Sequence, residues 1–338
     1  MPAINNGRNH FDVLTYTGTG ATQTISGLNF QPDFVWIKSR SAATDHKLTD
    51  SVRGVTKGLI SDSTAAESTD INGLTTFNSN GFTLGSDSVY NSNGATYVAW
   101  CWKAGGTAVT NTSGTITSQV SANPTAGFSV VTYMGNGTAG ATVGHGLGVK
   151  PALIIAKYRG GISSWPVYHQ SLGATKWILL NSTSAVTTSS QEWNNTEPTS
   201  SVFSIGNSSA NDNQSGLNVA YCFSEIAGYS AFGSYTGNGS DAGPFVWTGF
   251  LPRFVLIKLT SGIGGDWIIW DSSRNPYNVI GNYLYADSSA AEGSGSGMNF
   301  LSNGIKISND TGGGINGSGS TYIYAAFAEN PFKYSLAR

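Results

Sequence analysis

Apolar and polar residues alternate over many short runs in this chain, which is the pattern of β-strands with one buried face. FDVLTY at 11–16 alternates in this way, and TYVAWCW at 96–102 is dense in aromatic and β-branched residues, which favours a central strand. Asn80-Gly81 separates two further short runs and predicts a hairpin. Glycines interrupt every window of helical length, so we expect no helix and many short antiparallel strands.

One set of these runs occurs three times in the chain. The shared positions are a tyrosine, two glycines, a proline, a lysine and then an aspartate or histidine, with the lysine always six residues after the proline. Such self-similarity is the signature of a repeat architecture. The positions are Tyr16, Gly18, Gly20, Pro32, Lys38 and Asp50 in the first copy, Tyr133, Gly135, Gly137, Pro151, Lys157 and His169 in the second, and Tyr235, Gly237, Gly239, Pro252, Lys258 and Asp271 in the third.

The repeats predict three tandem antiparallel β-sandwiches of the jelly-roll or lectin-like kind, each of about 100 residues. Residues 1–103 form the first, 128–228 the second and 229–338 the third. The stretch 104–127 carries almost no charge and predicts a linker, although TITSQVS within it alternates and could add an edge strand. Because the second and third repeats follow each other with hardly any spacer, we expect them to form a rigid pair and the first to be hinged.

Composition narrows the class of protein. Charged residues make up 11% of the chain, against roughly 25% in ordinary globular proteins, and the net charge of -2 offers no electrostatic attraction to nucleic acid or to an anionic membrane. The aromatic content of 12% indicates a folded chain. No apolar run is long enough to span a membrane, and the first residues lack the pattern of a secretory signal, so we expect synthesis in a cytoplasm.

Two sets of residues at repeat-matched positions have plain structural interpretations. Cys101 and Cys222 occupy the same position of the first two repeats, too far apart for a disulfide, and predict small buried side chains. Lys38, Lys157 and Lys258 each end a strand, and we expect their ammonium groups to face water while their stems cover apolar surface.

A short Asp–Arg pattern also recurs. Asp50 is followed three residues later by Arg53, and Asp271 is followed likewise by Arg274, whereas the second repeat has His169 and no arginine. An Asp and an Arg this close could clamp a polar ligand. Because one copy lacks both charges, we favour the alternative that the aspartate starts a turn, accepts from its own backbone and pairs with the arginine.

Tryptophans provide the candidate contact site. Trp and Tyr on a rigid sandwich, beside Asn, Asp and Gln, are typical of sugar-binding surfaces, because the ring stacks on the apolar face of a sugar. Trp165 and Trp267 stand at repeat-matched strand positions and predict core or interface residues. Trp193 lies in QEWNNTEP, without apolar neighbours in the sequence, and predicts an exposed ligand contact together with Asn194 and Asn195.

Signals for catalysis are weak. The histidines are scattered, no nucleophile elbow or phosphate-binding loop occurs, and no cysteine–histidine cluster predicts a metal site. We therefore expect neither a cofactor nor an enzyme. Carboxylate pairs of glycosidases leave no sequence trace, so polysaccharide degradation stays as a remote alternative. Calcium binding by Asp- and Asn-rich loops, such as Gly85-Ser86-Asp87, also stays open.

Four segments are distinctive as motifs: residues 116–151, WPVYHQSLG at 165–173, residues 219–239 and the C-terminal YIYAAFAENPFKYSLAR at 322–338. In these segments the chain resembles a family of repeat proteins from tailed bacteriophages, particularly marine ones. The resemblance implies a tail-fibre or other virion-surface protein with lectin-like sandwich domains, and it supplies no catalytic residues.

The expected function is therefore a virion protein, assembled in the host cytoplasm, that attaches to host-surface glycans as a tail fibre or receptor-binding protein. Homotrimerisation follows from how phage fibres are generally built. The expected partners are other virion proteins and a host glycan, with no nucleic acid and no insertion into a membrane. The alternative is a structural decoration or adaptor protein of the capsid or tail, whose sandwiches bind other virion proteins only.

Overall fold

The protein is almost entirely antiparallel β structure, as the alternation of residues predicts. The computed structural model describes residues 4–208, 215–308 and 314–330. Within them, helical structure is limited to a 3₁₀ turn, η1 (Gly7–Asn9), and a single helical turn, α1 (Ser88–Asn91). The side chain of Asp87 caps α1 by accepting a hydrogen bond from the backbone N–H of Val89 at 2.8 Å.

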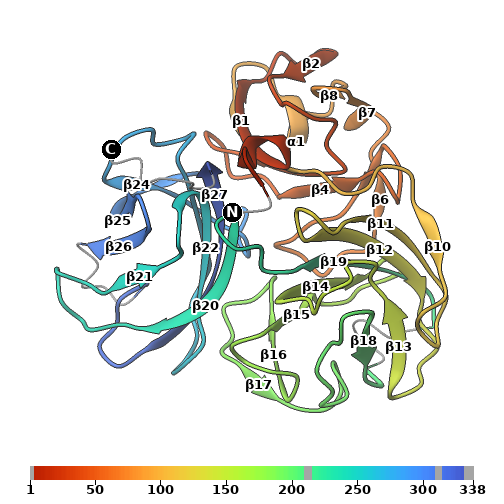
Figure 1. Ribbon diagram of the computed structural model, residues 1–338. Helices are drawn as coiled ribbons and strands as arrows, with labels where there is room; N and C mark the ends of the chain where they lie inside the picture. Colours follow the sequence, from red (N-terminus) through yellow and green to blue (C-terminus); the bar gives the residue numbers. More distant parts are fainter. Residues whose placement is uncertain (1–3, 209–214, 309–313, 331–338) are drawn as a thin grey trace.

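The same order of four strands occurs in three main sheets, one in each predicted repeat (Figure 1). We refer to residues 1–103, 128–228 and 229–338 as units one, two and three. In each unit the first strand pairs with the last, and the last pairs with the strand whose second-to-last residue is the repeated lysine. In sheet order the strands are β1 (Phe11–Thr17), β9 (Thr96–Trp102), β3 (Phe34–Ser39) and β4 (Lys47–Asp50) in unit one, β12 (Phe128–Met134), β19 (Leu217–Phe223), β14 (Leu153–Tyr158) and β15 (Pro166–His169) in unit two, and β20 (Ser230–Thr236), β27 (Thr321–Asn330), β22 (Leu251–Leu259) and β23 (Trp267–Asp271) in unit three.

Shorter strands complete each unit. The predicted hairpin is present in unit one and has a counterpart in unit three. Their two-residue loops are Ser79-Asn80 and Ser302-Asn303, and the first begins one residue earlier than predicted. The remaining strands are β2 (Gln23–Ser26), β5 (Lys57–Gly58), β6 (Ser68–Thr69), β7 (Leu74–Asn78) and β8 (Gly81–Leu84) in unit one, β13 (Ala141–Gly144), β16 (Lys176–Leu179), β17 (Thr187–Thr188) and β18 (Val202–Ile205) in unit two, and β21 (Phe245–Trp247), β24 (Ile280–Tyr285), β25 (Gly293–Leu301) and β26 (Gly304–Ser308) in unit three.

The stretch 104–127 is part of unit two's sheet. It forms β10 (Val109–Asn111) and β11 (Ser118–Asn123), and β11 pairs with β12 along its whole length. Residues 118–121 of TITSQVS therefore lie in a strand and not in a linker, but β10 and not β11 takes the edge of the sheet.

The main sheets of units one and two are buried on both faces, which explains why β3 and β9 have scarcely any exposed residue. Successive side chains of a strand point to opposite faces. In unit one, Val35 and Cys101 pack into the unit's own core, while Phe34 and Trp100 pack into a second cluster shared by all three units. Cys222 is likewise buried in the core of unit two, so both cysteines are small buried side chains, as predicted.

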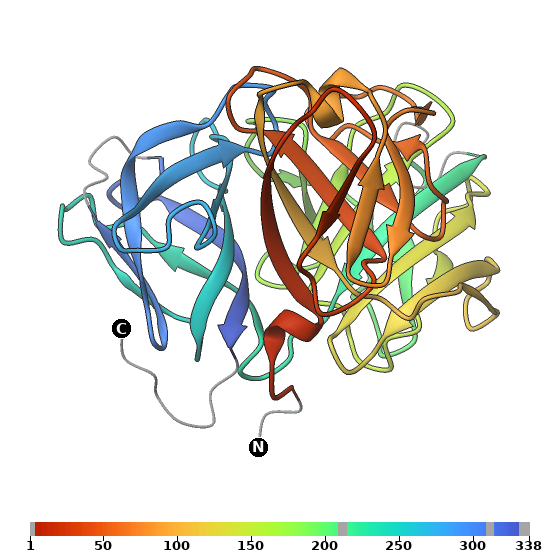
Figure 2. The same cartoon turned by 90° about the horizontal axis from the view of Figure 1, so that it is seen from above.

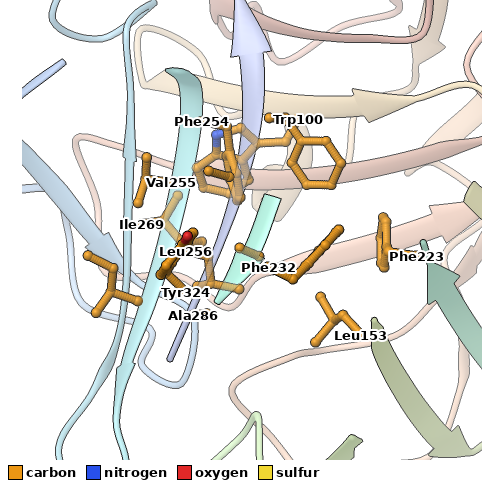
Figure 3. Close-up of a cluster of buried hydrophobic side chains, with 14 of the residues drawn as sticks. Trp100, Leu153, Phe223, Phe232, Phe254, Val255, Leu256, Ile269, Ala286 and Tyr324 are labelled. Atoms are coloured by element: carbon orange, nitrogen blue, oxygen red, sulfur yellow. The ribbon is translucent and has the colours of Figure 1, made fainter. Parts of the chain in front are cut away.

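Aromatic rings from the three units meet at the centre of the molecule. Trp102, Phe223 and Phe327 are the matched residues of β9, β19 and β27, and their ring centroids lie 6.1, 5.8 and 5.8 Å apart. The views in Figures 1 and 2 show the units side by side around this centre, and Figure 3 shows side chains from each of them in the shared cluster. Unit one is thus packed into a common core, and the expectation that it is hinged was wrong.

The three repeated lysines connect each unit to a neighbour. All three are fully buried, which contradicts the expectation that they face water. The ammonium group of Lys38 donates to the carbonyl of Ser289 in unit three at 3.1 Å. In the same way Lys157 donates to a unit-one carbonyl and Lys258 to a unit-two carbonyl, at 3.1 and 2.7 Å. Burial lowers the pKa of each lysine to about 8, because it disfavours the charged form.

Trp165 and Trp267 form a second set of contacts between units, as predicted for interface residues. The indole N–H of Trp165 donates to the carbonyl of Ile60 at 2.9 Å, and that of Trp267 to the carbonyl of Leu179 at 2.7 Å. In unit one, His46 stands at this position and its Nε2 lies 2.8 Å from a carbonyl oxygen of unit three. Burial, helped by the nearby Lys38 charge, lowers the pKa of His46 to about 3, so the ring is neutral at pH 7.

A buried ion network crosses two of the three contacts between units. Asp50 accepts from the backbone N–H of Arg53 and pairs with its guanidinium, which is the turn interpretation expected from the sequence. Arg53 also pairs with Glu67, and Glu67 forms a two-pronged pair with Arg159 of unit two. Asp271, Arg274, Glu292 and Arg40 repeat this arrangement between units three and one.

At the contact between units two and three the whole network is neutral. The four positions of the network are taken by His169, Leu172, Val186 and Thr260. The backbone N–H of Val186 still donates to the carbonyl of Thr260, and the backbone N–H of Glu67 donates to the carbonyl of Arg159 in the same way. Isolated buried charges cost several kcal/mol, typically about 3 to 5. Because all the charged residues of the network are missing from this contact together, none of them is left buried without a partner.

Candidate functional site

The tryptophan proposed from the sequence does not reach the surface. The side chain of Trp193 is 1% exposed and packs in the core of unit two, edge-on to Tyr168 at a centroid distance of 6.0 Å. The expectation of an exposed Trp193 was therefore wrong, because its apolar neighbours come from other strands. Asn194 and Asn195 lie at the surface with positive φ angles of 51° and 50°, and a ligand contact by these two amides stays a prediction.

Trp247 is the exposed tryptophan of this protein. Its side chain is 67% exposed, whereas the other tryptophans are buried or half-buried. It lies on β21, next to β26, and a hydroxyl of the main sheet, that of Tyr324, donates to its carbonyl at 3.2 Å. The ring therefore projects from a backbone that is fixed by its pairing with β26 and by the hydrogen bond from Tyr324.

Trp247 belongs to a regular face formed by β25, β26 and β21. Alternate residues of these strands, Phe300, Ile305 and Val246, point inward and are buried. The outward residues form two rows of three across the strands. One row is Asn299, Lys306 and Phe245, and the other is Leu301, Gly304 and Trp247. We call these six residues the aromatic face.

The aromatic face combines exposed apolar area with one charge. Phe245 is 45% exposed and Leu301 is 37% exposed. A Cβ added to Gly304 would lie 2.9 Å from the ring of Phe245, so the absence of a side chain there lets the ring lie against the strand. Lys306 is half-buried beside Phe245 and donates to the carbonyl of Gly243.

The sister units show what the scaffold itself requires at these positions. The register between β2 and β8 matches that between β21 and β26, and the inward residue Ile25 is buried like Val246. The outward residues of unit one are small and polar at the positions of Phe245, Trp247 and Lys306. They are Thr24, Ser26 and Thr83 in unit one, and Thr142, Gly144 and Ser204 in unit two, where the segment near Asn111 lies against Gly144. The aromatic residues of unit three are therefore not needed for folding.

A second surface feature lies between units one and two. A cleft of about 450 Å³ is lined by Met134, Leu217, Tyr158 and the Glu67–Arg159 pair. Met134 and Leu217 face each other across β12 and β19 and are 56% and 48% exposed. The matched cross-strand pairs are Thr17 with Thr96 in unit one and Thr236 with Thr321 in unit three.

Residues 4–208, 215–308 and 314–330 contain neither a cluster of metal ligands nor a helix that could span a membrane. No group of three or more His, Cys, Asp or Glu side chains in these ranges could hold a metal ion. None of the helices found there is both long and apolar enough to cross a membrane.

Comparison with known proteins places the chain in one family. The family described as "Domain of unknown function (DUF7483)" matches residues 6–331, so one domain covers all three units. No curated protein and no solved structure matches the chain. With nearly its whole length matched, this chain belongs to the DUF7483 family.

Proposed function

We propose that this protein is a virion-surface protein of a tailed bacteriophage that binds a host-surface glycan through the aromatic face of unit three. The observation that carries the binding proposal is the exposed Trp247 on a rigid strand, at a position where unit one has an exposed serine, Ser26. The resemblance of its sequence to phage repeat proteins supports the assignment to the virion. In this proposal the protein acts by binding and not as an enzyme, and a homotrimer stays a prediction.

The chemistry of the aromatic face suits a saccharide. The indole of Trp247 and the ring of Phe245 offer flat apolar area to the C–H face of a sugar, while Asn299 and Lys306 on the neighbouring strands offer polar groups to its hydroxyls. Large aromatic side chains give much contact area for little lost conformational freedom. Because all these residues stand on paired strands, little ordering is needed on binding.

The first test is replacement of Trp247 by the serine of unit one. A Trp247→Ser variant should bind glycans at least about 30-fold more weakly, because loss of an aromatic anchor typically costs about 2 kcal/mol or more. A glycan array would identify the ligand, and titration calorimetry would then give the dissociation constants of wild type and variant.

The matched control is Ile263→Ser, which removes a 99% exposed apolar side chain from the connection between β22 and β23. This variant should bind like wild type. Equal binding by Trp247→Ser and wild type, or no glycan bound by wild type, would refute the proposal. The thermal midpoint of Trp247→Ser should match that of wild type, since the ring packs little.

A second candidate function is that of a structural adaptor, and the Met134–Leu217 pair favours it. Two exposed apolar side chains stand where both sister units have threonines, beside a cleft. Exposed apolar groups that the fold does not require often mark protein–protein contacts.

Met134→Thr/Leu217→Thr copies the sister units and tests the adaptor function. We expect this double variant to fold and to bind glycan unchanged, but to be recovered with purified phage particles at a clearly lower level than wild type. Unchanged recovery would remove the reason to assign a protein contact to this cleft. The Trp247→Ser variant is the control, because it should enter particles normally.

A further inference from the structure

Lys306 gives the aromatic face a positive charge. It stands directly across from Phe245 on the neighbouring strand and diagonally from Trp247. Diagonal neighbours on adjacent strands have Cα atoms about 7–8 Å apart, within reach of long side chains. One sugar residue and its substituent can therefore contact both the ring of Trp247 and the ammonium group of Lys306.

The scaffold does not require this charge. Thr83 in unit one and Ser204 in unit two stand at the position of Lys306, next to Thr24 and Thr142. No ion pair among the described residues involves Lys306. An ammonium group has three N–H donors, and its bond to the Gly243 carbonyl uses one of them while holding the side chain beside Phe245.

The rest of the face carries no opposing charge. Asn299, on the other side of Lys306, offers an amide, and Leu301 and Gly304 are uncharged. A neutral sugar hydroxyl would accept a hydrogen bond from Lys306, whereas an anionic group would add the attraction between opposite charges to that bond. Lys is a point charge, so carboxylate, sulfate and phosphate groups all satisfy it.

We propose that the glycan recognised at this face is acidic, with Lys306 binding its anionic group while Trp247 stacks on the sugar ring. This inference rests on the proposed function, since it names the class of glycan for the same site. The aromatic rings supply affinity for a saccharide in general, and Lys306 supplies the preference for an acidic one.

The experiment compares matched pairs of glycans that differ only in an acidic group. An array would carry uronic-acid, sialylated, sulfated and phosphorylated glycans beside their neutral counterparts. We expect wild type to bind members of one acidic class at least about tenfold more tightly than their neutral counterparts, the effect of one charge-assisted hydrogen bond. The acidic class that binds identifies the anionic group.

Variants of Lys306 separate charge from packing. Lys306→Met keeps the stem and should reduce binding of the acidic glycan about tenfold, to the level of the neutral counterpart, whereas Lys306→Arg keeps the charge and should retain most of the affinity. Binding by wild type should weaken as salt rises from 0.05 to about 0.5 M, and binding by Lys306→Met should not.

The outcomes distinguish this inference from the proposed function. Equal binding of acidic and neutral glycans, or an unchanged affinity in Lys306→Met, would overturn the acidic preference while the loss of binding in Trp247→Ser still supported glycan binding. If wild type bound no glycan, both proposals would fall.

Discussion

Arg53→Leu is expected to lower the free energy of unfolding by about 3 to 5 kcal/mol, the cost of leaving a buried charge without its partner. The Arg53 guanidinium is fully buried and pairs with Asp50 and Glu67. It also donates to the carbonyl of Leu48 at 2.8 Å and to the hydroxyl of Tyr221, in unit two, at 3.2 Å. Removing it would leave the Asp50 carboxylate, which has no exposed side-chain area, without its cation.

Lys150→Leu is the matched control for this prediction. Lys150 and Glu197 form an equally short pair at 2.6 Å, but the two side chains are 44% and 49% exposed. Exposed pairs contribute only about 0 to 1 kcal/mol. Urea-induced unfolding followed by tryptophan fluorescence would measure both variants, and similar midpoints for the two would contradict the role assigned to the buried network.

A double variant makes the same prediction sharper. Asp50→Asn/Arg53→Leu removes both charges, and the amide can still accept from the backbone of the turn. It should lose less stability than the sum of the two single variants, by about 0.5 to 3 kcal/mol, because no charge is left alone. The contact between units two and three is the natural precedent, since it has His169 and Leu172 in place of Asp and Arg.

Trp102→Ala is expected to cost about 3 to 5 kcal/mol and to loosen all three units together. The Trp102 ring contacts aromatic residues of unit two, such as Phe128 and Phe223, and of unit three, such as Phe254 and Phe327. A cavity at this point removes contacts from each unit.

Hydrogen exchange read by mass spectrometry would test whether the units depend on one another. In Trp102→Ala, protection should fall in β9, β19 and β27 alike, because the cavity adjoins all three strands. Trp193→Ala removes a ring of the same size from the core of unit two alone, so its effect should be largest in that unit. If the loss of protection in Trp102→Ala were confined to unit one, the units would be independent domains.

The aromatic face could have been found from the sequence by a closer comparison of the repeats. Phe245-Val246-Trp247 alternates like Thr24-Ile25-Ser26, and both segments lie between the second repeated glycine and the repeated proline. That comparison would have shown aromatic residues at two positions where unit one has polar ones. Trp193 lacks apolar neighbours in sequence, but that says little about its contacts in space.

The sequence by itself determined the all-β class, the positions of most strands, the repeated scaffold and, to within one residue, the hairpin of unit one. These features depend on neighbouring residues: alternation specifies the two faces of a strand, and turn residues specify where it ends. The Asp–Arg turns could be predicted for the same reason, since their partners are three residues apart.

Only the tertiary structure decided which side chains are buried between units. Lys38 ends a strand and would face water in an isolated sandwich, but unit three covers it and supplies the carbonyl of Ser289, 251 residues away. Trp193 is buried within unit two against Tyr168 of another strand, and Trp247 is exposed because none of the described segments covers it. Alternation shows that a strand has two faces, but whether the second face meets water or another unit depends on contacts between residues far apart in the chain.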